Sequence, residues 1–94
     1  MVVNLSNHSY DVYIGRGSSY GNPYKIGVDG TRSEVIELYR IWLRHKLNDP
    51  EFMELFLTLR GKILGCHCKP KACHGDVIEE ELSRLGSPLN NFIG

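Results

Sequence analysis

The chain has 94 residues, the length of one small domain, and we expect residues 1–94 to form a single folded unit. Hydrophobic residues make up 41% of the chain and charged residues 23%, which is typical of folded rather than disordered proteins. The 11 basic residues balance the 11 acidic ones. Because domains that bind nucleic acid are usually strongly basic, this balance makes nucleic acid an unexpected partner.

No apolar stretch approaches the ~20 residues that span a membrane, and the N-terminus lacks the basic and apolar segments of a signal peptide. The three cysteines all lie between positions 66 and 73. An odd and clustered group of this kind does not indicate a disulfide framework. We therefore expect a cytoplasmic protein with reduced thiols and no membrane partner.

The first part of the chain predicts two short strands and a glycine-rich loop. Residues 2–5 are largely apolar, and residues 10–14 alternate, with Val12 and Ile14 on one side. Residues 15–23 are dense in glycine and turn-forming residues. This loop is too long for a tight hairpin, so we expect it to be functional.

Two helices follow. Thr31 and Glu34 have the spacing of a capping box, which predicts a helix from residue 31 to about residue 47. Asp49 suits an N-cap and Pro50 the first helical position, so a second helix is expected to start there and to end at Gly61. The expected apolar faces consist of Val35, Leu38, Tyr39, Trp42 and Leu43 in the first helix and Phe52, Leu55, Phe56 and Leu59 in the second.

Residues 62–68 predict a strand, and a third helix is expected from about residue 74 to residue 85. The order β-β-α-α-β-α predicts a small α/β domain of two or three layers with a short, mainly parallel sheet. Parallel strands deliver the loops at their carboxyl ends to one edge, where ligands bind in open α/β sheets. Residues 15–22 and 66–76 should therefore face each other across a ligand crevice.

The first of these loops has the groups that a phosphate requires. Glycines allow a close approach of the backbone, and exposed N–H groups, hydroxyls and an arginine bind anions. The candidate ligand-binding residues are Arg16, Gly17, Ser18, Ser19 and Asn22. The alternative is a surface loop in which Arg16 pairs with a helix carboxylate.

Tyrosines flank the same loop. Tyr20 is the first choice for stacking on a nucleobase, and Tyr13 and Tyr24 are further candidates. The alternative for Tyr20 is that its ring only anchors the loop.

The second loop allows three interpretations. In the first it binds zinc, although the spacing is unlike that of common zinc motifs; the ligands would be Cys66, Cys68, Cys73 and His74. In the second, Cys73 is a reactive thiolate at a helix start, near two lysines, and His74 is its base. In the third, the cysteines are small core residues, which we favour for Cys66 and Cys68.

The start of the third helix supplies the remaining candidates. Asp76 either interacts with the helix dipole or accepts hydrogen bonds from ribose hydroxyls, and we favour the second role. The backbone at the helix start is expected to help hold phosphate. The ligand-binding residues expected in this loop are Lys71, Cys73, His74, Gly75 and Asp76.

The segments 12–24 and 65–77, together with the helical segment 39–42, resemble an uncharacterised family of small domains from bacteria and phages. The family is catalogued only as a domain of unknown function, so the resemblance implies no established activity. His67 departs from the pattern, because the family often has tryptophan there. A phage setting implies one role, since small phage proteins with basic pockets can sequester nucleotide signals of the host.

Our expectation is therefore a protein that binds a small phosphorylated nucleotide, of the ADP-ribose or cyclic-nucleotide kind, without a cofactor. Because the chain is short for enclosing such a ligand, we expect a homo-oligomer. The alternative is a nucleotide hydrolase or transferase that uses Cys73 and His74, with or without zinc. A third class is an interaction module held together by zinc.

Overall fold

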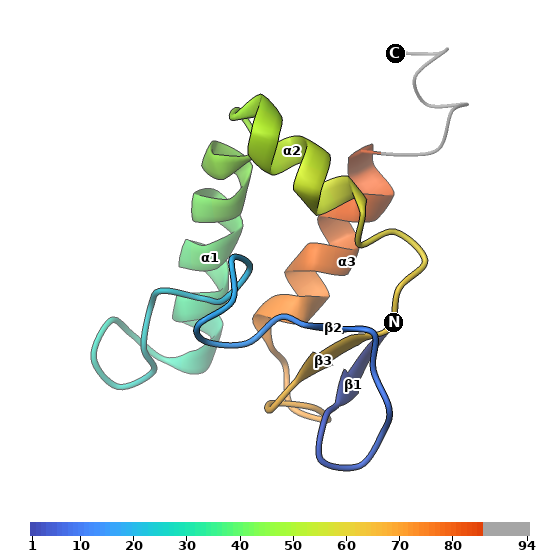
Figure 1. The fold of residues 1–94 in the computed structure, drawn as a ribbon. Helices are drawn as coiled ribbons and strands as arrows, with labels where there is room; N and C mark the ends of the chain where they lie inside the picture. Colours follow the sequence, from blue (N-terminus) through green and yellow to red (C-terminus); the bar gives the residue numbers. More distant parts are fainter. Residues whose placement is uncertain (86–94) are drawn as a thin grey trace.

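A computed structural model describes residues 1–85 of the chain, and Figure 1 shows the arrangement of its elements. Three strands and three helices follow one another in the expected order. They are β1 (Val2–Asn4), β2 (Val12–Tyr13), α1 (Arg32–Lys46), α2 (Pro50–Leu57), β3 (Leu64–Cys66) and α3 (His74–Leu85). The predicted α/β class is confirmed.

The sheet has the order β1-β3-β2, and β3 is parallel to both of its neighbours. Leu64 is paired with Val2 on one side and with Val12 on the other. All three residues of β3 are buried, as expected for the central strand of a parallel sheet. A side chain at Gly65 would collide with the ring of Tyr10, because a Cβ there would lie 2.7 Å from Cγ of Tyr10.

The predicted helix starts are confirmed. The Thr31 hydroxyl accepts from the Glu34 N–H at 3.3 Å, and the Glu34 carboxylate accepts from the Thr31 N–H at 2.8 Å. The Asp49 carboxylate accepts from the N–H of Glu51 at 3.0 Å, with Pro50 as the first helical residue. These side chains satisfy backbone donors that a helix leaves free at its N-terminus.

The expected end of α2 at Gly61 is wrong. The helix ends at Leu57, and the Thr58 hydroxyl donates to the Leu55 carbonyl at 2.6 Å. Residues 58–60 continue in tight turns whose N–H groups each reach back three residues. Gly61, at a φ of 78°, ends this run of turns rather than the helix.

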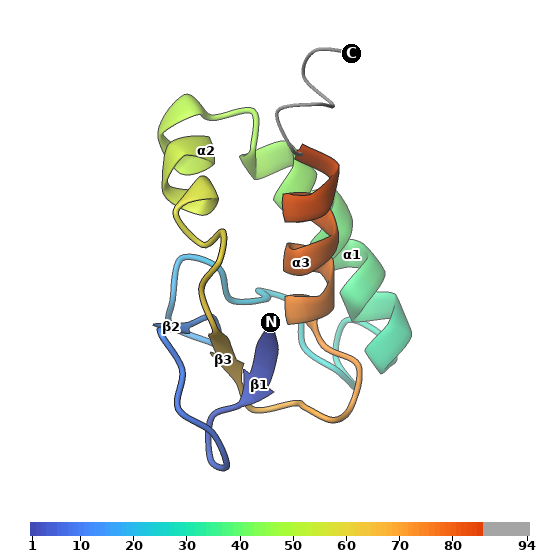
Figure 2. The ribbon, with the colours of Figure 1, turned by 90° about the vertical axis from the view of Figure 1, so that its right-hand side faces the viewer.

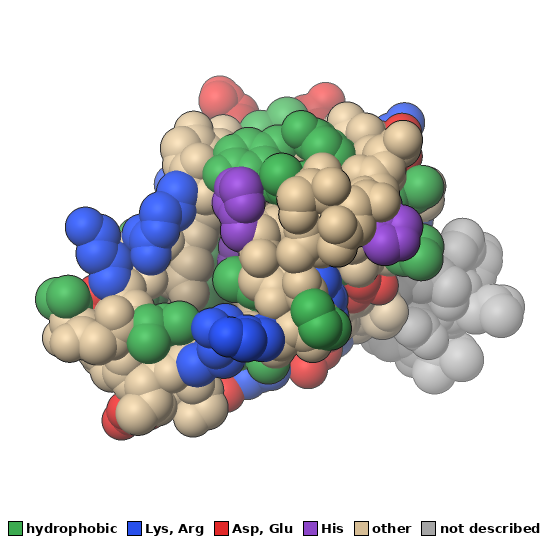
Figure 3. All heavy atoms as spheres, turned by 90° about the horizontal axis from the view of Figure 1, so that it is seen from below, with side chains coloured by type: hydrophobic (Ala, Val, Ile, Leu, Met, Phe, Trp, Pro, Cys, Tyr) green, Lys and Arg blue, Asp and Glu red, His purple; other side chains and the backbone are tan. Residues whose placement is uncertain are grey.

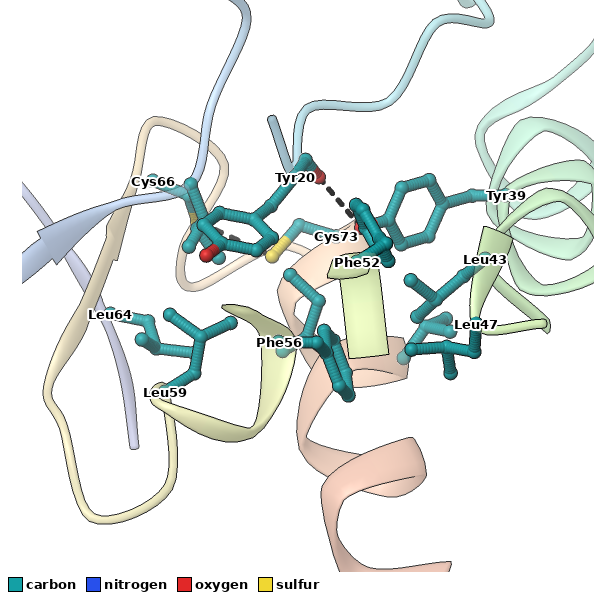
Figure 4. Close-up of a cluster of buried hydrophobic side chains, with 13 residues drawn as sticks. Tyr20, Tyr39, Leu43, Leu47, Phe52, Phe56, Leu59, Leu64, Cys66 and Cys73 are labelled. Carbon is teal, nitrogen blue, oxygen red and sulfur yellow. Dashed lines mark hydrogen bonds between the residues drawn. The ribbon is translucent and has the colours of Figure 1, made fainter. Parts of the chain in front are cut away.

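The core lies where the three helices meet the sheet (Figures 1 and 2), and Figure 4 shows its central side chains. α3 contacts both β1 and α1. Fully buried side chains of the core include Ile14, Tyr39, Leu43, Phe56, Leu59, Leu64, Val77 and Ile78. The expected apolar faces hold except at Leu38, which is half-buried but is not among the side chains packed against the core, and at Leu55, which is 45% exposed.

No helix within residues 1–85 is long and apolar enough to cross a membrane.

Candidate functional site

A cleft of about 280 Å³ opens at the edge of the sheet where β2 and β3 end. Seen from this side, lysine and arginine side chains flank a hollow in the surface (Figure 3). The loops that follow the two strands both contribute to its walls, as do the first turns of α1 and α3. The cleft is lined by Tyr13, Gly15, Arg16, Asn22, Tyr24, Ile26, Arg32, Val35, Ile36, His67, Cys68, Ala72, Cys73 and His74.

The cleft is cationic. Its lining contains two arginines but no aspartate or glutamate. Within residues 1–85 the guanidinium of Arg16 has no hydrogen-bond or ion-pair partner, so the alternative pairing with a helix carboxylate is not found. Three arginines elsewhere on α1 and α3, by contrast, all pair with glutamates of these helices. Positive charge is thus left unneutralised at the cleft, although the whole chain is neutral.

Arg32 is the second cation of the lining, and the patterns of the two loops do not predict it. Its Nη1 donates to the Ala72 carbonyl at 3.0 Å, and in the described part of the chain it has no carboxylate partner. Arg32 is the first residue of α1, where a positive charge opposes the helix dipole. This unfavourable position is the signal in the sequence that could have identified the residue.

Aromatic rings form part of the wall. Tyr13 and Tyr24, the further stacking candidates, are both half-buried and line the cleft. The Tyr13 hydroxyl donates to the Arg16 carbonyl at 3.0 Å, and the ring meets His67 edge-on with centroids 6.1 Å apart. A ligand in the cleft would therefore be surrounded by two tyrosine rings and by the imidazoles of His67 and His74.

Asn22 connects the first loop to α1. Its Nδ2 donates to the Val35 carbonyl at 3.1 Å, and its Oδ1 accepts from the Tyr24 N–H at 2.9 Å. These bonds hold Tyr24 beside the first turns of the helix. Asn22, a candidate ligand-binding residue, thus lines the cleft and also shapes its wall.

The placement of Tyr20 does not support base stacking. The side chain is only 7% exposed and lies in the core, tilted against Phe52 with ring centroids 6.2 Å apart (Figure 4). Its hydroxyl donates to the Leu55 carbonyl at 3.4 Å, and its carbonyl accepts from the Tyr39 hydroxyl at 2.6 Å. Burial raises the pKa of Tyr20. The ring anchors the loop, which was the alternative interpretation.

Gly15 lines the cleft, but the next small residues of the first loop, Gly17, Ser18 and Ser19, lie outside its lining. The Ser18 hydroxyl donates to the Gly15 carbonyl at 2.7 Å and accepts from the Tyr20 N–H at 3.3 Å. Gly17 has a φ of 89°, which explains glycine at this turn. Ser19 is exposed and likewise outside the lining. Ser18 and Gly17 therefore shape the loop.

Cys66 and Cys73 form a buried thiol pair. Their sulfur atoms lie 3.3 Å apart, and each residue is 1% exposed (Figure 4). Burial, with the hydrogen bond to Cys66, raises the pKa of Cys73 to about 12. A buried thiol with a raised pKa is protonated near neutral pH, which does not favour Cys73 as a nucleophile. Cys66 lies in the core as favoured, whereas Cys68 is half-buried and also lines the cleft.

His74, the first residue of α3, is buried at 8% exposure. Its Nε2 lies 2.6 Å from the carbonyl oxygen of Ile14, and its ring meets Tyr39 edge-on with centroids 5.1 Å apart. Burial lowers the pKa of His74, and the nearby Arg16 acts in the same direction. The imidazole is therefore neutral near neutral pH.

The other predicted residues of the second loop lie outside the lining. Burial acts to raise the pKa of Asp76, but hydrogen bonds from Lys69 and from the Cys73 N–H, the latter 3.1 Å long, leave it lowered. Asp76 thus stabilises the start of α3, which was the alternative to ribose binding. Gly75 packs closely on β1, since a Cβ there would lie 2.8 Å from Cγ1 of Val2. Lys71 is exposed.

Residues 3–84 match the family described as "Domain of unknown function (DUF4326)", which covers most of the chain. The chain belongs to this family. It is also 42% identical over 86 residues to an "Uncharacterized 12.4 kDa protein in nrdA-td intergenic region" of Enterobacteria phage T4. That alignment covers 89% of this chain and 78% of the phage protein. No solved structure matches the chain.

The expected membership of an uncharacterised family with phage representatives is thereby confirmed.

In this DUF4326 chain the four potential zinc ligands do not come together. Within residues 1–85 no group of three or more histidine, cysteine or acidic side chains is placed to hold a metal ion. His74 uses Nε2 to contact Ile14, while Cys66 and Cys73 contact each other. The geometry gives zinc no support.

Proposed function

We propose that this chain binds a small phosphorylated nucleotide in the cleft. The observation that carries the proposal is that Arg16 and Arg32 line one cleft without a carboxylate partner in the described residues. A guanidinium presents a planar array of donors that matches phosphate oxygens. An uncompensated pair of guanidinium groups in a neutral chain favours an anion as the ligand.

The rest of the lining favours a nucleotide over a bare anion. The rings of Tyr13 and Tyr24 offer surfaces for stacking on a base, and Ile26 and Ile36 add apolar wall. Small-molecule sites commonly combine such apolar walls with a few polar groups. A cleft of about 280 Å³ is slightly below the roughly 300–1,000 Å³ of such sites. A ligand as large as ADP-ribose would therefore extend beyond the cleft, so that a second copy of the chain would enclose it in a homo-oligomer.

The biological role that we propose is sequestration. One relative of the chain is a protein of Enterobacteria phage T4. A phage protein that binds a nucleotide without converting it keeps that nucleotide from the proteins of the host. Signalling nucleotides of host immunity, of the ADP-ribose or cyclic-nucleotide kind, are ligands of this class. The raised pKa of Cys73 favours holding over cleavage, because it removes the thiolate that the enzymatic alternative requires.

The test is calorimetric titration of AMP, 3′,5′-cyclic AMP and ADP-ribose into the wild type and three variants. We expect Arg16→Gln and Arg32→Gln each to weaken binding at least about tenfold, the range for a lost hydrogen bond to a charged group. Lys62→Gln is the matched control, because it removes one exposed positive charge from a residue outside the lining. Its affinity should equal that of the wild type.

Two results would contradict the proposal: no binding of any of the three nucleotides, or binding that both arginine variants leave unchanged. Chromatography of the ligand recovered after denaturation separates the two roles. Intact nucleotide indicates sequestration, and a converted nucleotide indicates the enzymatic alternative.

A further inference from the structure

The hydrogen bond between His74 and Ile14 fixes the tautomer of the imidazole. Nε2 of His74 lies 2.6 Å from the Ile14 carbonyl oxygen, which can only accept. Nε2 therefore carries the proton and donates it. Because burial keeps this ring neutral, the other nitrogen, Nδ1, carries a lone pair and is an acceptor.

Nδ1 of His74 has no hydrogen-bond partner among the described residues. At the same time, no buried side-chain nitrogen or oxygen within residues 1–85 lacks a partner. Nδ1 must therefore reach open space. His74 lines the cleft, so the cleft is the open space that the structure shows beside this ring.

Nδ1 of His74 accepts hydrogen bonds, and in this it differs from the two guanidinium groups of the lining. The guanidinium groups of Arg16 and Arg32 only donate hydrogen bonds, as phosphate requires. A lone pair on a neutral imidazole repels an unprotonated phosphate oxygen, so Nδ1 of His74 is unsuited to contact with such an oxygen. It matches a neutral donor, which in a nucleotide is a sugar hydroxyl or an N–H group of the base.

We propose that Nδ1 of His74 accepts a hydrogen bond from a hydroxyl or N–H of the bound nucleotide, and that the cleft therefore requires such a donor beside the phosphate. This inference rests on the proposed function and divides the cleft into two parts. Arg16 and Arg32 bind the phosphate, and Nδ1 of His74 accepts a hydrogen bond from the sugar or the base. The unsatisfied lone pair makes a ligand without the donor bind less tightly, because the acceptor loses its water without gaining a partner.

The variant that isolates this contact is His74→Gln. The glutamine amide nitrogen can take the place of Nε2 and keep the donation to Ile14, while no acceptor remains at the place of Nδ1. Two probes are titrated into wild type and variant, inorganic phosphate and AMP. We expect AMP to bind the variant about tenfold more weakly and inorganic phosphate to bind both proteins equally.

Analogues of AMP locate the donor. The 2′-deoxy and 3′-deoxy analogues each lack one sugar hydroxyl, and purine riboside 5′-monophosphate lacks the amino group of the base. The analogue that lacks the donor should bind the wild type about tenfold more weakly than AMP does. It should show no further loss with His74→Gln, because the two changes remove the same hydrogen bond.

Nitrogen NMR of the unmodified protein gives a second measurement that does not depend on the folding of a variant. Nδ1 of His74 should show the signal of an unprotonated nitrogen, and AMP should shift that signal while inorganic phosphate leaves it in place. A protonated Nδ1, or equal losses of AMP and phosphate binding in His74→Gln, would overturn the inference. So would AMP binding that the variant leaves unchanged. If the wild type binds neither probe, the proposed function fails instead.

Discussion

His74 shows at the scale of one residue how burial links the candidate site to stability. Its imidazole contacts the ring of Tyr39 and the Ile14 carbonyl. The charges of Arg16 and Asp76 act on its pKa from a greater distance. Burial lowers the pKa of His74 in the folded chain, whereas an unfolded chain titrates histidine near the usual value of about 6.5. The unfolded state thus binds the proton more readily, and protonation favours unfolding.

The expected pH dependence follows from this sign. The contribution of neutral His74 to stability is complete above about pH 6.5 and falls as the pH decreases toward the lowered pKa of the folded state. Carboxylates with lowered pKa values, such as Asp76 and Glu80, lose their contribution only near and below about pH 4. Urea unfolding between about pH 7 and pH 5 should therefore show a loss of stability that is smaller in His74→Gln. An equal loss in both proteins would contradict this assignment.

The residues of the two loops show what a sequence pattern can and cannot place. The segment 15–22, with its glycines and candidate phosphate-binding side chains, lies at the edge of the sheet where the cleft opens. The direction of each side chain depends on how the loop folds back, which local spacing does not encode. Tyr20 consequently turned into the core while Tyr13 and Tyr24 reached the cleft. Arg32 was missed because it lies in a helix and not in either loop.

At the scale of elements, α1 and α3 are joined by an ion-pair network around a buried carboxylate. Glu81 of α3 is fully buried and accepts from Nε of Arg44 and from Nε of Arg84, each at 2.8 Å. Glu80, its neighbour, is half-exposed and pairs with Arg40. Because buried polar atoms are costly to leave without partners, the two glutamates should differ in their importance.

We expect Glu81→Ala to lower the free energy of unfolding by about 1–3 kcal/mol, through lost hydrogen bonds and the space that remains between the helices. Glu80→Ala is the matched control, and it should cost less than about 1 kcal/mol because exposed ion pairs contribute little. Urea denaturation of the two variants checks the difference. Equal effects would show that the network around Glu81 does not stabilise the packing of α1 on α3.

Local signals predicted the helices better than they predicted the strands. A capping box, an Asp-Pro start and an acidic first turn act over three or four residues, so α1, α2 and α3 begin where the sequence predicts. The extent of a strand depends on which residues its neighbours can reach. β2 therefore has only two residues, although the alternating pattern covers five. At the end of α2 the Thr58 hydroxyl donates to the Leu55 carbonyl, a bond that the pattern of apolar residues does not predict.

At the scale of the whole molecule, zero net charge and a cationic cleft predict a weak dependence of binding on salt. A protein that binds nucleic acid loses affinity steeply with salt, because each neutralised phosphate releases counterions. Here the two arginines of the cleft, Arg16 and Arg32, can neutralise about two phosphates of a single strand, and the chain has no excess of positive charge to add to them. The logarithm of the affinity for an oligothymidylate should therefore fall with the logarithm of the salt concentration with a slope no steeper than about −1.4.

Titration of a fluorescent oligothymidylate at several KCl concentrations measures this slope, and AMP measured under the same conditions provides the comparison. AMP carries its charge on one phosphate that both arginines can reach. We therefore expect the affinity for AMP to be higher than the affinity per nucleotide of the oligothymidylate. Arg16→Gln should flatten both salt dependences, since it removes half of the cationic charge of the lining. A steep slope that Arg16→Gln leaves unchanged would locate nucleic-acid binding on another surface and would contradict the predicted weak dependence on salt.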